Sequence, residues 1–488
     1  MTMGARLVFV GLAVLSGALL FVSDYPLHAW PLQTLALLPF LFALERLCAS
    51  RRAALLAGLA LGLAETLPLL RVLEFPLFMG LPLALYLSLL WMLIGLGIYL
   101  LRDWPSPLGP LAAGAVAVLV EWVDFTVVPV WGTAQCFARV WSAAPLVAQL
   151  VAAGGVTVLV FVLVGGQALM GRLLWGAPRE RLPSAIALAA LLALAGGWCA
   201  WSYTRPSRGE LTVAALGWTG ADLQARGLTR PAPPGSYPVA EPRALFDGLY
   251  QPLVLEAARR GAELIASPEV GFFLEPGDEA ELLERAARLA HRLRRALVIG
   301  YFSRGSKTNR AVLLDGRSGL RLEYEKTHLI PFVEKYQPGP GAIASVILRT
   351  EGERLRVGLM ICQDDNFTDL ARGHGRAGTA LMVVPTNDWK QVKDFHLENA
   401  IFRAVENRYA VVRAASNGVS AIISPRGQVL ARRDPFVEGP GLALARVPLG
   451  GGPTLYARLG GWPPLASLAL LGGGWLWRRR RGRGPRPC

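Results

Sequence analysis

Three residues in the polar stretch between about residue 204 and residue 458 have types and positions suited to nucleophilic catalysis. Cys362 follows a mostly apolar, strand-like run over 355–361 and precedes a polar turn. Glu269 follows a second short apolar run, over 263–266, and Lys326 lies between the two in sequence. A thiol at the exit of a buried strand can be held rigid while its sulfur faces a cleft, as a nucleophile requires. The sequence therefore predicts a nucleophilic centre at Cys362.

Each of the three side chains has a chemical role in such a centre. Because a thiol is mostly protonated near neutral pH, Cys362 needs a base and a cationic environment. Glu269 can take the thiol proton and return it to a leaving group. Lys326 can lower the thiol pKa and stabilise an oxyanion, helped by the backbone N–H of Gln363. Taken singly, Cys362 would more often be a small buried apolar side chain, and Glu269 and Lys326 would more often be surface charges. Their joint occurrence at strand ends favours catalysis.

The remaining cysteines indicate neither a metal centre nor a disulfide framework. The chain has five cysteines, at 48, 136, 199, 362 and 488, with no CxxC pair and no metal-ligand spacing. The first three lie in or beside apolar segments. We therefore expect no metal and no organic cofactor.

The composition predicts a membrane protein. Hydrophobic residues make up 53% of the 488 residues and charged residues only 17%, and the mean hydropathy is +0.39. The net charge of +15 could suggest nucleic-acid binding, but six arginines are packed into the last eleven residues. Beside an apolar helix such a cluster is typical of a cytoplasmic anchor against anionic lipid, so no nucleic acid is expected.

Apolar runs predict eight membrane spans. Most approach the ~20 residues that cross a ~30 Å hydrocarbon core. Seven precede the polar region, at about 5–23, 29–44, 53–70, 81–101, 107–123, 146–169 and 184–203, and an eighth covers 459–477. The predicted organisation is a membrane domain over 1–203, a catalytic domain over 204–458, a C-terminal transmembrane helix over 459–477 and a basic cytoplasmic tail over 478–488. Since no convincing cleavage site follows the first span, we interpret that span as an uncleaved anchor.

The arginines between these spans predict the orientation. They fall in alternate loops and lie on one side if both termini are cytoplasmic. The residues concerned are Arg46, Arg51, Arg52, Arg102, Arg172, Arg179, Arg181 and Arg478 to Arg481. The polar domain should then face the extracytoplasmic, periplasmic side of the membrane.

Inside the polar domain, short apolar runs alternate with helical patterns, which predicts a layered α/β or α-β-β-α fold. The expected helices cover 243–260, 277–295 and 395–407. The expected strands cover 211–216, 263–266, 296–300, 355–361, 380–385, 410–415 and 419–424, with a hairpin of 309–314 and 320–324 around 315–316.

Several motifs resemble those of the bacterial apolipoprotein N-acyltransferases, the membrane-embedded branch of the nitrilase superfamily. The matching stretches are Pro268-Glu269, Lys326-x-His328-Leu329-Ile330-Pro331-Phe332-x-Glu334, Ile361-Cys362, Asn387-Asp388-Trp389, His396-Leu397, Arg403-Ala404-x-Glu406, Arg413 and Ser416-Asn417-Gly418. In the apolar part, Trp131-Gly132, Gln135, Gln149-Leu150 and Gly154-Gly155-Val156 are also similar. The resemblance covers nearly the whole chain.

The resemblance implies a nitrilase-like α-β-β-α domain joined to a multi-span helical domain in the bacterial inner membrane. The resemblance also implies that Glu269, Lys326 and Cys362 form the catalytic triad and that Glu334 is a second essential glutamate. The implied reaction transfers a fatty acyl chain from a phospholipid, through a cysteine thioester, to the α-amine of a diacylglyceryl-cysteine at the N-terminus of an apolipoprotein.

Two departures from the family pattern concern substrate positioning. Gln363-Asp364 stand where the family usually has Tyr-Glu, so Gln363 loses an aromatic ring and Asp364 has a shorter side chain that could still hold a carboxylate in place. The first strand ends in Gly217-Trp218-Thr219 instead of the family's motif, and Trp218 is interpreted as an aromatic that contacts lipid.

Other residues are expected near the substrate. Phe272 and Phe273 are interpreted as a lid over the lipid. Asn387 and Trp389 follow a strand end, where residues that face a cleft collect. His396 is as compatible with core packing as with support of the active site.

Two alternatives to acyl transfer stay open. A membrane-tethered amidase would use the same triad with water as the second substrate, and Gln363 and the altered first strand favour it. A catalytically silent protein that binds lipids or lipoproteins is disfavoured by the intact triad. The preferred phospholipid, the acceptor and the oligomeric state are not encoded in any recognisable motif.

Overall fold

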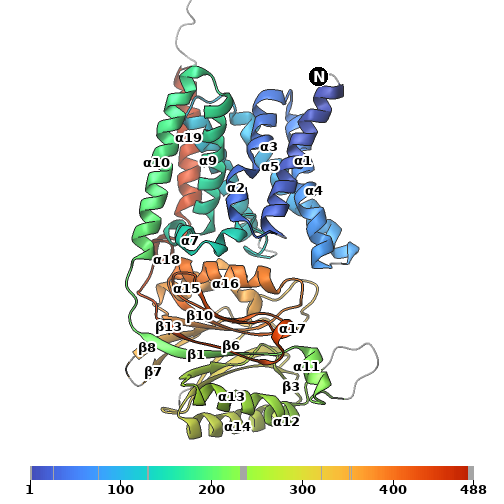
Figure 1. The fold of residues 1–488 in the computed structure, drawn as a ribbon, viewed down its shortest axis with the longest axis vertical. Coiled ribbons are helices and arrows are strands. Elements are labelled where there is room, and N and C mark those ends of the chain that lie inside the picture. The colour runs from blue at the N-terminus through green and yellow to red at the C-terminus, as the bar shows by residue number, and fades with distance from the viewer. Residues whose placement is uncertain are drawn as a thin grey trace, which may run out of the picture. The chain divides into compact units, whose positions relative to one another are not determined.

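The computed structural model divides into two compact units. It describes residues 3–25, 27–74, 76–128, 131–230, 239–319, 321–350, 352 and 354–481. The first unit, the helical unit, comprises Met1–Pro129, Gln135–Ser202 and Leu459–Cys488. The second, the α/β unit, comprises Val130–Ala134 and Tyr203–Arg458 (Figure 1).

Six helices of the helical unit are long and apolar enough to cross a membrane. They are α1 (Met3–Asp24), α4 (Arg51–Leu73), α5 (Leu77–Leu101), α6 (Leu108–Trp122) with its continuation η2 (Val123–Val127), α9 (Val156–Trp175) and α10 (Pro178–Tyr203). Each coincides with a predicted span, although α9 begins later than expected. The stretch before it forms the short helices η3 (Arg139–Ala143), α7 (Pro145–Ala148) and α8 (Val151–Gly154), and α8 ends because Gly155 adopts a φ of 75°.

The predicted span over 29–44 is not one uninterrupted helix, and its crossing of the membrane stays a prediction. The structure divides it into α2 (Trp30–Ala36), α3 (Leu38–Phe42) and the π-turn η1 (Ala43–Leu47). Pro39 has no N–H, so the hydrogen bonding of α2 cannot continue through it. Gln167 of α9 accepts the N–H of Leu37 at 2.8 Å and donates to the carbonyl of Gln33 at 3.0 Å, so it provides partners for backbone groups near the break.

The predicted C-terminal span corresponds to α19 (Trp462–Arg481), which follows the short α18 (Leu455–Leu459). The last four residues of α19 are arginines, and its uncharged part is therefore shorter than 18 residues. A membrane-spanning role for this helix stays a prediction. Within the helical unit α19 packs against α6.

Small residues allow the helices of this unit to approach closely. α4 packs along α5 and α1, and α6 packs along α9. A Cβ at Gly62 of α4 would lie 2.9 Å from the Cβ of Ser88 on α5, and one at Gly58 would collide with the backbone of Met92. Because lipid tails are as apolar as leucine, such close packing is a main source of helix association in a membrane.

The α/β unit has two facing sheets. The first has the order β13-β1-β2-β4-β5-β6, with β3 paired to β4, and the second has the order β12-β11-β10-β9-β8-β7. The strands of the first sheet are β1 (Glu210–Gly217), β2 (Leu264–Ala266), β3 (Phe272–Leu274), β4 (Ala296–Ser303), β5 (Thr308–Asp315), β6 (Arg321–Glu325) and β13 (Gly441–Pro448). Those of the second are β7 (Ser345–Arg349), β8 (Arg354–Leu359), β9 (Leu381–Asn387), β10 (Ala410–Ser416), β11 (Ser420–Ile423) and β12 (Val429–Arg433).

Helices cover the outer faces of the two sheets, which confirms the α-β-β-α prediction. On the first sheet lie α11 (Gly220–Ala225), α12 (Pro242–Leu245) with η4 (Phe246–Tyr250), α13 (Gln251–Arg259) and α14 (Asp278–Leu293). On the second lie α15 (Thr368–Arg376) and α16 (Lys393–Asn407), and α17 (Pro435–Glu438) follows β12 (Figure 1). Strands β1, β2, β8, β9 and β10 are buried on both faces, which explains their nearly continuous apolar sequences.

Two apolar cores hold these layers together. One lies between the sheets and includes Val213, Val357 and Val412, and the other lies between the first sheet and its helices and includes Ile265, Val254 and Leu289. The predicted strands and helices are all present, and the strands missed by sequence reasoning are β3, β7, β12 and β13. The last three are short or carry charged residues at exposed positions, so their apolar signal is weak.

Candidate active site

Cys362 lies at a strained turn beyond the end of β8. It opens the 3₁₀ turn η5 (Cys362–Asn366), has a φ of 47° and is 2% exposed. A non-glycine residue in this left-handed region costs energy, and such strain collects at functional sites. Two residues separate the strand end from Cys362, and the Ile361 N–H donates to the Asp364 carboxylate at 3.0 Å. The turn is therefore fixed on both sides of the sulfur.

Glu269 follows β2 of the other sheet. Its backbone N–H donates to the carbonyl of Thr386 on β9 at 3.2 Å, which ties the loop of Glu269 to the sheet that carries the cysteine. The next residue, Val270, has a φ of 48°, a second strained position. Glu269 is 2% exposed, so its carboxylate depends on partners within the protein.

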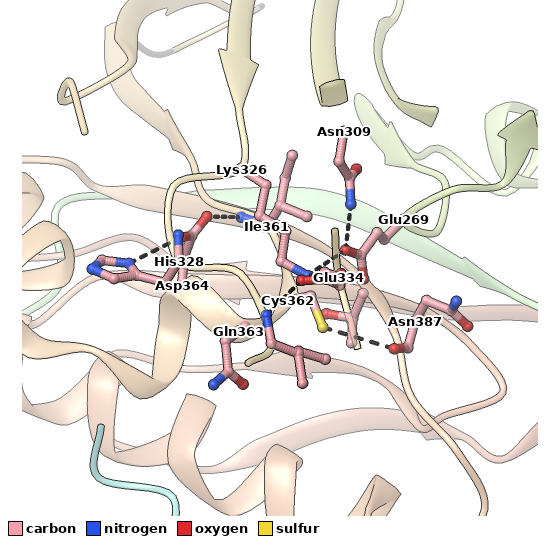
Figure 2. A network of polar contacts seen from close by, with 12 residues as sticks. Glu269, Asn309, Lys326, His328, Glu334, Ile361, Cys362, Gln363, Asp364 and Asn387 are labelled. Carbon is pink, nitrogen blue, oxygen red and sulfur yellow. Dashed lines mark hydrogen bonds and ion pairs between the residues drawn. The ribbon is translucent and has the colours of Figure 1, made fainter. Parts of the chain in front are cut away.

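Lys326 provides that partner. It follows β6, where its backbone N–H donates to the carbonyl of Asn309 at 2.9 Å. Its Nζ lies 2.8 Å from Oε1 of Glu269 and 2.7 Å from Oε1 of Glu334, and the lysine is 1% exposed. Figure 2 shows Glu269, Lys326 and Glu334 converging beside Cys362. The structure thus brings together the three predicted catalytic residues and the predicted second glutamate.

Burial and the neighbouring charges determine the protonation state of each residue at this centre before substrate binds. Burial raises the pKa of Glu269, Lys326 acts against that rise, and Glu334 adds to it. Burial works against the charge of Lys326, but the negative charges of Cys362, when it is ionised, and of the two glutamates hold the lysine pKa well above the ordinary value. Burial and Glu269 raise the pKa of Cys362 well above its usual range, with Lys326 opposing. Cys362 is therefore a neutral thiol at rest, and a base must take its proton during attack.

The Cys362 thiol has two acceptors within reach. It donates to the carbonyl of Asn387 at 3.7 Å (Figure 2), and the Glu269 carboxylate is the neighbouring acceptor that can take the same proton instead. Asn387 in turn accepts from the Ser416 hydroxyl and from Asn417, both at 2.9 Å. The predicted position of Asn387 in the cleft is consistent with these contacts, whereas Trp389 is half-buried and its role stays a prediction.

Asn309 and Tyr336 are site residues that sequence reasoning missed. The Asn309 amide donates to Oε1 of Glu269 at 2.7 Å and to the Tyr336 hydroxyl at 3.0 Å. That hydroxyl donates to Glu334 at 2.6 Å. Asn309 stands opposite Lys326 across the β5–β6 hairpin, so its role follows from strand register. Lys335, which adds a cation to this loop in the sequence, is exposed.

Asp364 joins the loop that follows Lys326 to the cysteine turn. Its carboxylate accepts from the N–H groups of Thr327 at 3.2 Å and His328 at 2.7 Å, from the Tyr324 hydroxyl at 2.8 Å and from Ile361. The His328 ring also contacts it at 3.1 Å. Asp364 is fully buried, so its shorter side chain does hold a carboxylate at this position.

The side chain of Gln363 occupies a different environment. Its Oε1 accepts from Asn366 at 2.8 Å, while its buried Nε2 has no hydrogen-bond partner in the described part of the chain.

The Asn366 carbonyl accepts from the N–H of Thr133 at 2.8 Å and from its hydroxyl at 3.0 Å. Gly132, with a φ of 58°, is needed there because a Cβ would collide with that carbonyl. The Trp131-Gly132 motif thus belongs to the α/β unit and fixes the end of the cysteine turn.

Two residues predicted to contact lipid are instead core residues. Phe272 is fully buried in β3 and packs edge-on against Tyr250 at 5.5 Å between ring centroids. Trp218 is 1% exposed and continues β1 through a bridge to Ser416. Sequence reasoning placed Phe272 in a lid and Trp218 at the end of the first strand, and it missed their burial because the pairing that buries them is non-local. Phe273 stacks on Phe302 at 5.0 Å on the other face of β3, and its lid role stays a prediction.

Comparison with known proteins identifies the family. The family model described as carbon-nitrogen hydrolase matches residues 248–452, and the model of the apolipoprotein N-acyltransferase N-terminal domain matches residues 16–169. The chain is 31% identical over 375 residues to the apolipoprotein N-acyltransferase of Gloeobacter violaceus, covering 70% of this chain and 67% of that one. The chain belongs to the apolipoprotein N-acyltransferase family of the nitrilase superfamily.

Other relatives match mainly part of the chain. The apolipoprotein N-acyltransferase of Geobacter metallireducens is 30% identical over 255 residues, 46% of this chain, and the match spans about half, 48%, of that relative. The human deaminated glutathione amidase is 31% identical over 235 residues, covering 40% of this chain and 70% of its own. An amidase from Nesterenkonia sp. of known structure is 26% identical, with a TM-score of 0.38, covering 50% of this chain and 92% of its own.

Family membership and the six apolar helices together make this a bacterial membrane protein. Within its family it carries Gln363-Asp364 directly after the cysteine, and the geometry explains how the shorter acid is accommodated. All five donors around Asp364 come from within the α/β unit, on β6, its following loop and the residue before the cysteine. The cysteine turn therefore keeps a buried carboxylate anchor.

Proposed function

We propose that this protein transfers a fatty acyl chain from a phospholipid to the α-amine of an N-terminal diacylglyceryl-cysteine on an apolipoprotein. The observation that carries the proposal is the buried Glu269–Lys326–Cys362 centre in a chain whose helical part belongs to the same family. Both substrates are anchored in a bilayer, which suits a catalytic unit joined to membrane helices. We infer that the α/β unit faces the periplasm and both termini the cytoplasm, because the arginines between the spans favour that orientation.

In the first half-reaction Cys362 attacks the ester carbonyl of a phospholipid. Glu269 takes the thiol proton as the carbon–sulfur bond forms, and Lys326 and the Gln363 N–H stabilise the oxyanion. When the ester C–O bond breaks, Glu269 returns the proton to the departing alkoxide. The products are a thioester on Cys362 and a lysophospholipid.

In the second half-reaction the α-amine attacks the thioester. Glu269 removes a proton from the attacking nitrogen, the carbon–sulfur bond breaks, and the sulfur is reprotonated. Glu334 keeps Lys326 in place throughout, because the two are 2.7 Å apart. A buried ammonium between two carboxylates can stabilise the transition-state oxyanion without reorganising.

A second candidate function is hydrolysis of small amides by the same triad. The similarity of part of the chain to the human deaminated glutathione amidase favours it. The acyltransferase is preferred because the amidase match covers 40% of this chain, whereas the match to the Gloeobacter violaceus relative covers 70% of it.

The test is mass spectrometry of the Cys362 peptide after purified protein is incubated with phospholipid. We expect a fatty-acyl thioester, which moves to the amine of an added diacylglyceryl-cysteine peptide. The matched controls are the C362S variant and the same peptide with an acetylated amine, neither of which should give a transferred chain. Absence of the thioester, together with hydrolysis of small amides by the unmodified protein, would assign the amidase instead.

A further inference from the structure

Four buried charged side chains form a closed ring close to the catalytic sulfur. Asp365 lies on η5, Asp388 directly after β9, His396 on α16 and Arg413 on β10. None is more than 7% exposed. Burial of four ionisable groups is costly unless each is paired, so the arrangement calls for a physical reason.

Each member of the ring contacts two of the others, and of their side-chain polar atoms only Nε of Arg413 is buried without a hydrogen-bond partner among the described residues. His396 Nε2 lies 2.8 Å from Oδ1 of Asp365, and its Nδ1 lies 2.7 Å from Oδ1 of Asp388. Arg413 donates from one nitrogen to Oδ2 of Asp388 at 2.6 Å and from another to Oδ2 of Asp365 at 3.3 Å. Each acid thus contacts both cations, and four separate elements are joined.

His396 is an imidazolium in this setting. An ionised carboxylate only accepts hydrogen bonds, so both ring nitrogens must donate. Burial and Arg413 lower the pKa of His396, but Asp365 and Asp388 outweigh them and raise it to about 9. With His396 protonated, the ring holds two positive and two negative charges and is neutral.

Other charged groups on the elements around His396 have partners of their own. Those pairs are Lys393 with Asp394 and Asp434, Arg403 with Glu406, and Asp369 of α15 with His328. Two more buried groups lie on α16: Arg403 also interacts electrostatically with Asp365, and Glu398 is 9% exposed. The ring's own four members hold the contacts to one another, and Arg413 also interacts with Cys362.

The ring borders the sulfur directly. Sγ of Cys362, a carboxylate oxygen of Asp388 and a ring nitrogen of His396 all lie within 4.8 Å of one another. Asp388 also follows Asn387, whose carbonyl accepts the thiol at 3.7 Å. These three ligand atoms are close enough for a metal ion, but both nitrogens of His396 already contact carboxylates and Arg413 already balances them.

We propose that His396 is a positioning residue for Cys362. Its positive charge cancels the negative charge of Asp388 beside the sulfur, and its contact with Asp388 holds the Asn387–Asp388 turn, so that the Cys362 thiolate can form. The proposal rests on the proposed function only in taking Cys362 as the nucleophile. Without this cation the ring would carry a net negative charge, and a thiolate would form beside an uncompensated carboxylate.

The test is the pH profile of Cys362 alkylation by iodoacetamide in the full-length, detergent-solubilised protein. Mass spectrometry of the Cys362 peptide separates this thiol from the other cysteines. Since a unit charge about 5 Å away acts strongly in a protein interior, we expect H396Q to slow alkylation about 10- to 100-fold at pH 7.5 and to shift the profile to higher pH. The double variant D365N/H396Q has a neutral ring again and should recover to within about threefold of the unmodified protein.

A matched control is H374Q. His374 is also fully buried, but burial lowers its pKa to about 4, so it is uncharged at neutral pH. This variant should lower the melting temperature and leave the alkylation profile in place. If H396Q does not fold, the double variant alone decides, because a loss of tenfold or more there contradicts a charge-based role.

Two results would overturn the proposal. One is an H396Q variant that melts earlier but keeps the normal alkylation profile, as a purely structural histidine would. The other is a double variant as slow as the single one. Failure of the proposed function looks different, since Cys362 would alkylate normally and respond to the ring variants, yet form no acyl thioester with phospholipid.

Discussion

Replacement of Lys326 by methionine measures how much the lysine stabilises the neighbouring carboxylates of Glu269 and Glu334. Met keeps the length and apolar character of the lysine stem but removes the ammonium that lies 2.8 Å from Glu269 and 2.7 Å from Glu334. The site is largely closed to water, since Lys326 and Glu269 are 1% and 2% exposed and the Glu334 side chain is 14% exposed. Two carboxylates then face each other without a cation in the interior.

The expected loss follows from this burial. Removing one partner of a buried ion pair typically lowers the free energy of unfolding by about 3–5 kcal/mol. For a unit of this size that corresponds to a fall in melting temperature of roughly 6–20 °C. Glu269 can escape the cost only by taking up a proton, so its pKa, which burial already raises, must rise further.

The sign of the pH dependence is what tests the reasoning. An acid whose pKa is raised by folding destabilises the protein increasingly above its unfolded pKa of about 4.3, by about 1.4 kcal/mol per pH unit. The stability difference between K326M and the unmodified protein should therefore be large at pH 8. It should shrink at pH 5 by up to about 4 kcal/mol, because Glu269 is then protonated in the folded state and the pH is less than one unit above its unfolded pKa of about 4.3.

The assay is thermal unfolding in detergent at pH 5 and pH 8, with intrinsic tryptophan fluorescence as the signal. The matched control is K393M, because Lys393 also lies between two acids, Asp394 at 2.7 Å and Asp434 at 2.8 Å, but is only partly buried. That variant should lose about 1 kcal/mol or less. A K326M variant that is destabilised equally at both pH values would refute the inference that Lys326 compensates buried charge.

Three further outcomes concern the surrounding contacts. Replacing Asp364 by glutamate adds a methylene to a fully buried site, and we expect a loss of about 1–3 kcal/mol in denaturant unfolding. Burial lowers the pKa of His328, but Asp364 and Asp369 raise it to about 9. Its stabilisation should be complete below about pH 6.5 and lost as pH rises through about 9, so the melting difference from H328Q should vanish at alkaline pH. Replacing Tyr336 by phenylalanine removes a 2.6 Å hydrogen bond to Glu334, and thioester formation measured by mass spectrometry should slow about tenfold with little change in KM.

The sequence alone determined the type of chemistry and the fold class. Glu269 and Cys362 were recognisable because each follows a short apolar run, and Lys326 because it follows a predicted hairpin strand. Strands β2, β6 and β8 do end within three residues before them. Strands buried on both faces give continuous apolar runs, and α14 and α16 give a helical period, so most elements were also visible. Apolar runs of about 20 residues identified the six long helices by the same local logic.

Tertiary structure decided whatever depends on pairing between distant segments. Asn309 reaches Glu269 only because β4 pairs with both β2 and β5. Phe272 is buried through the pairing of β3 with β4, and Trp218 through its bridge to Ser416 of β10. At the helix break near Leu37, the free backbone N–H likewise finds its acceptor in Gln167, which lies 130 residues away in the sequence. Hydrophobic periodicity is a local property, whereas register and burial depend on contacts that the chain makes far along its length.

The ring around His396 shows the same division most clearly. Its four members are separated by up to 48 residues and lie on four elements, so no spacing in the sequence indicates that they are in contact. The resemblance marked Asp388, His396 and Arg413 individually, but their charges and their distance from the sulfur appear only in the folded chain. Electrostatic interactions act through space, and a pKa is therefore a property of the fold and not of the residue type alone.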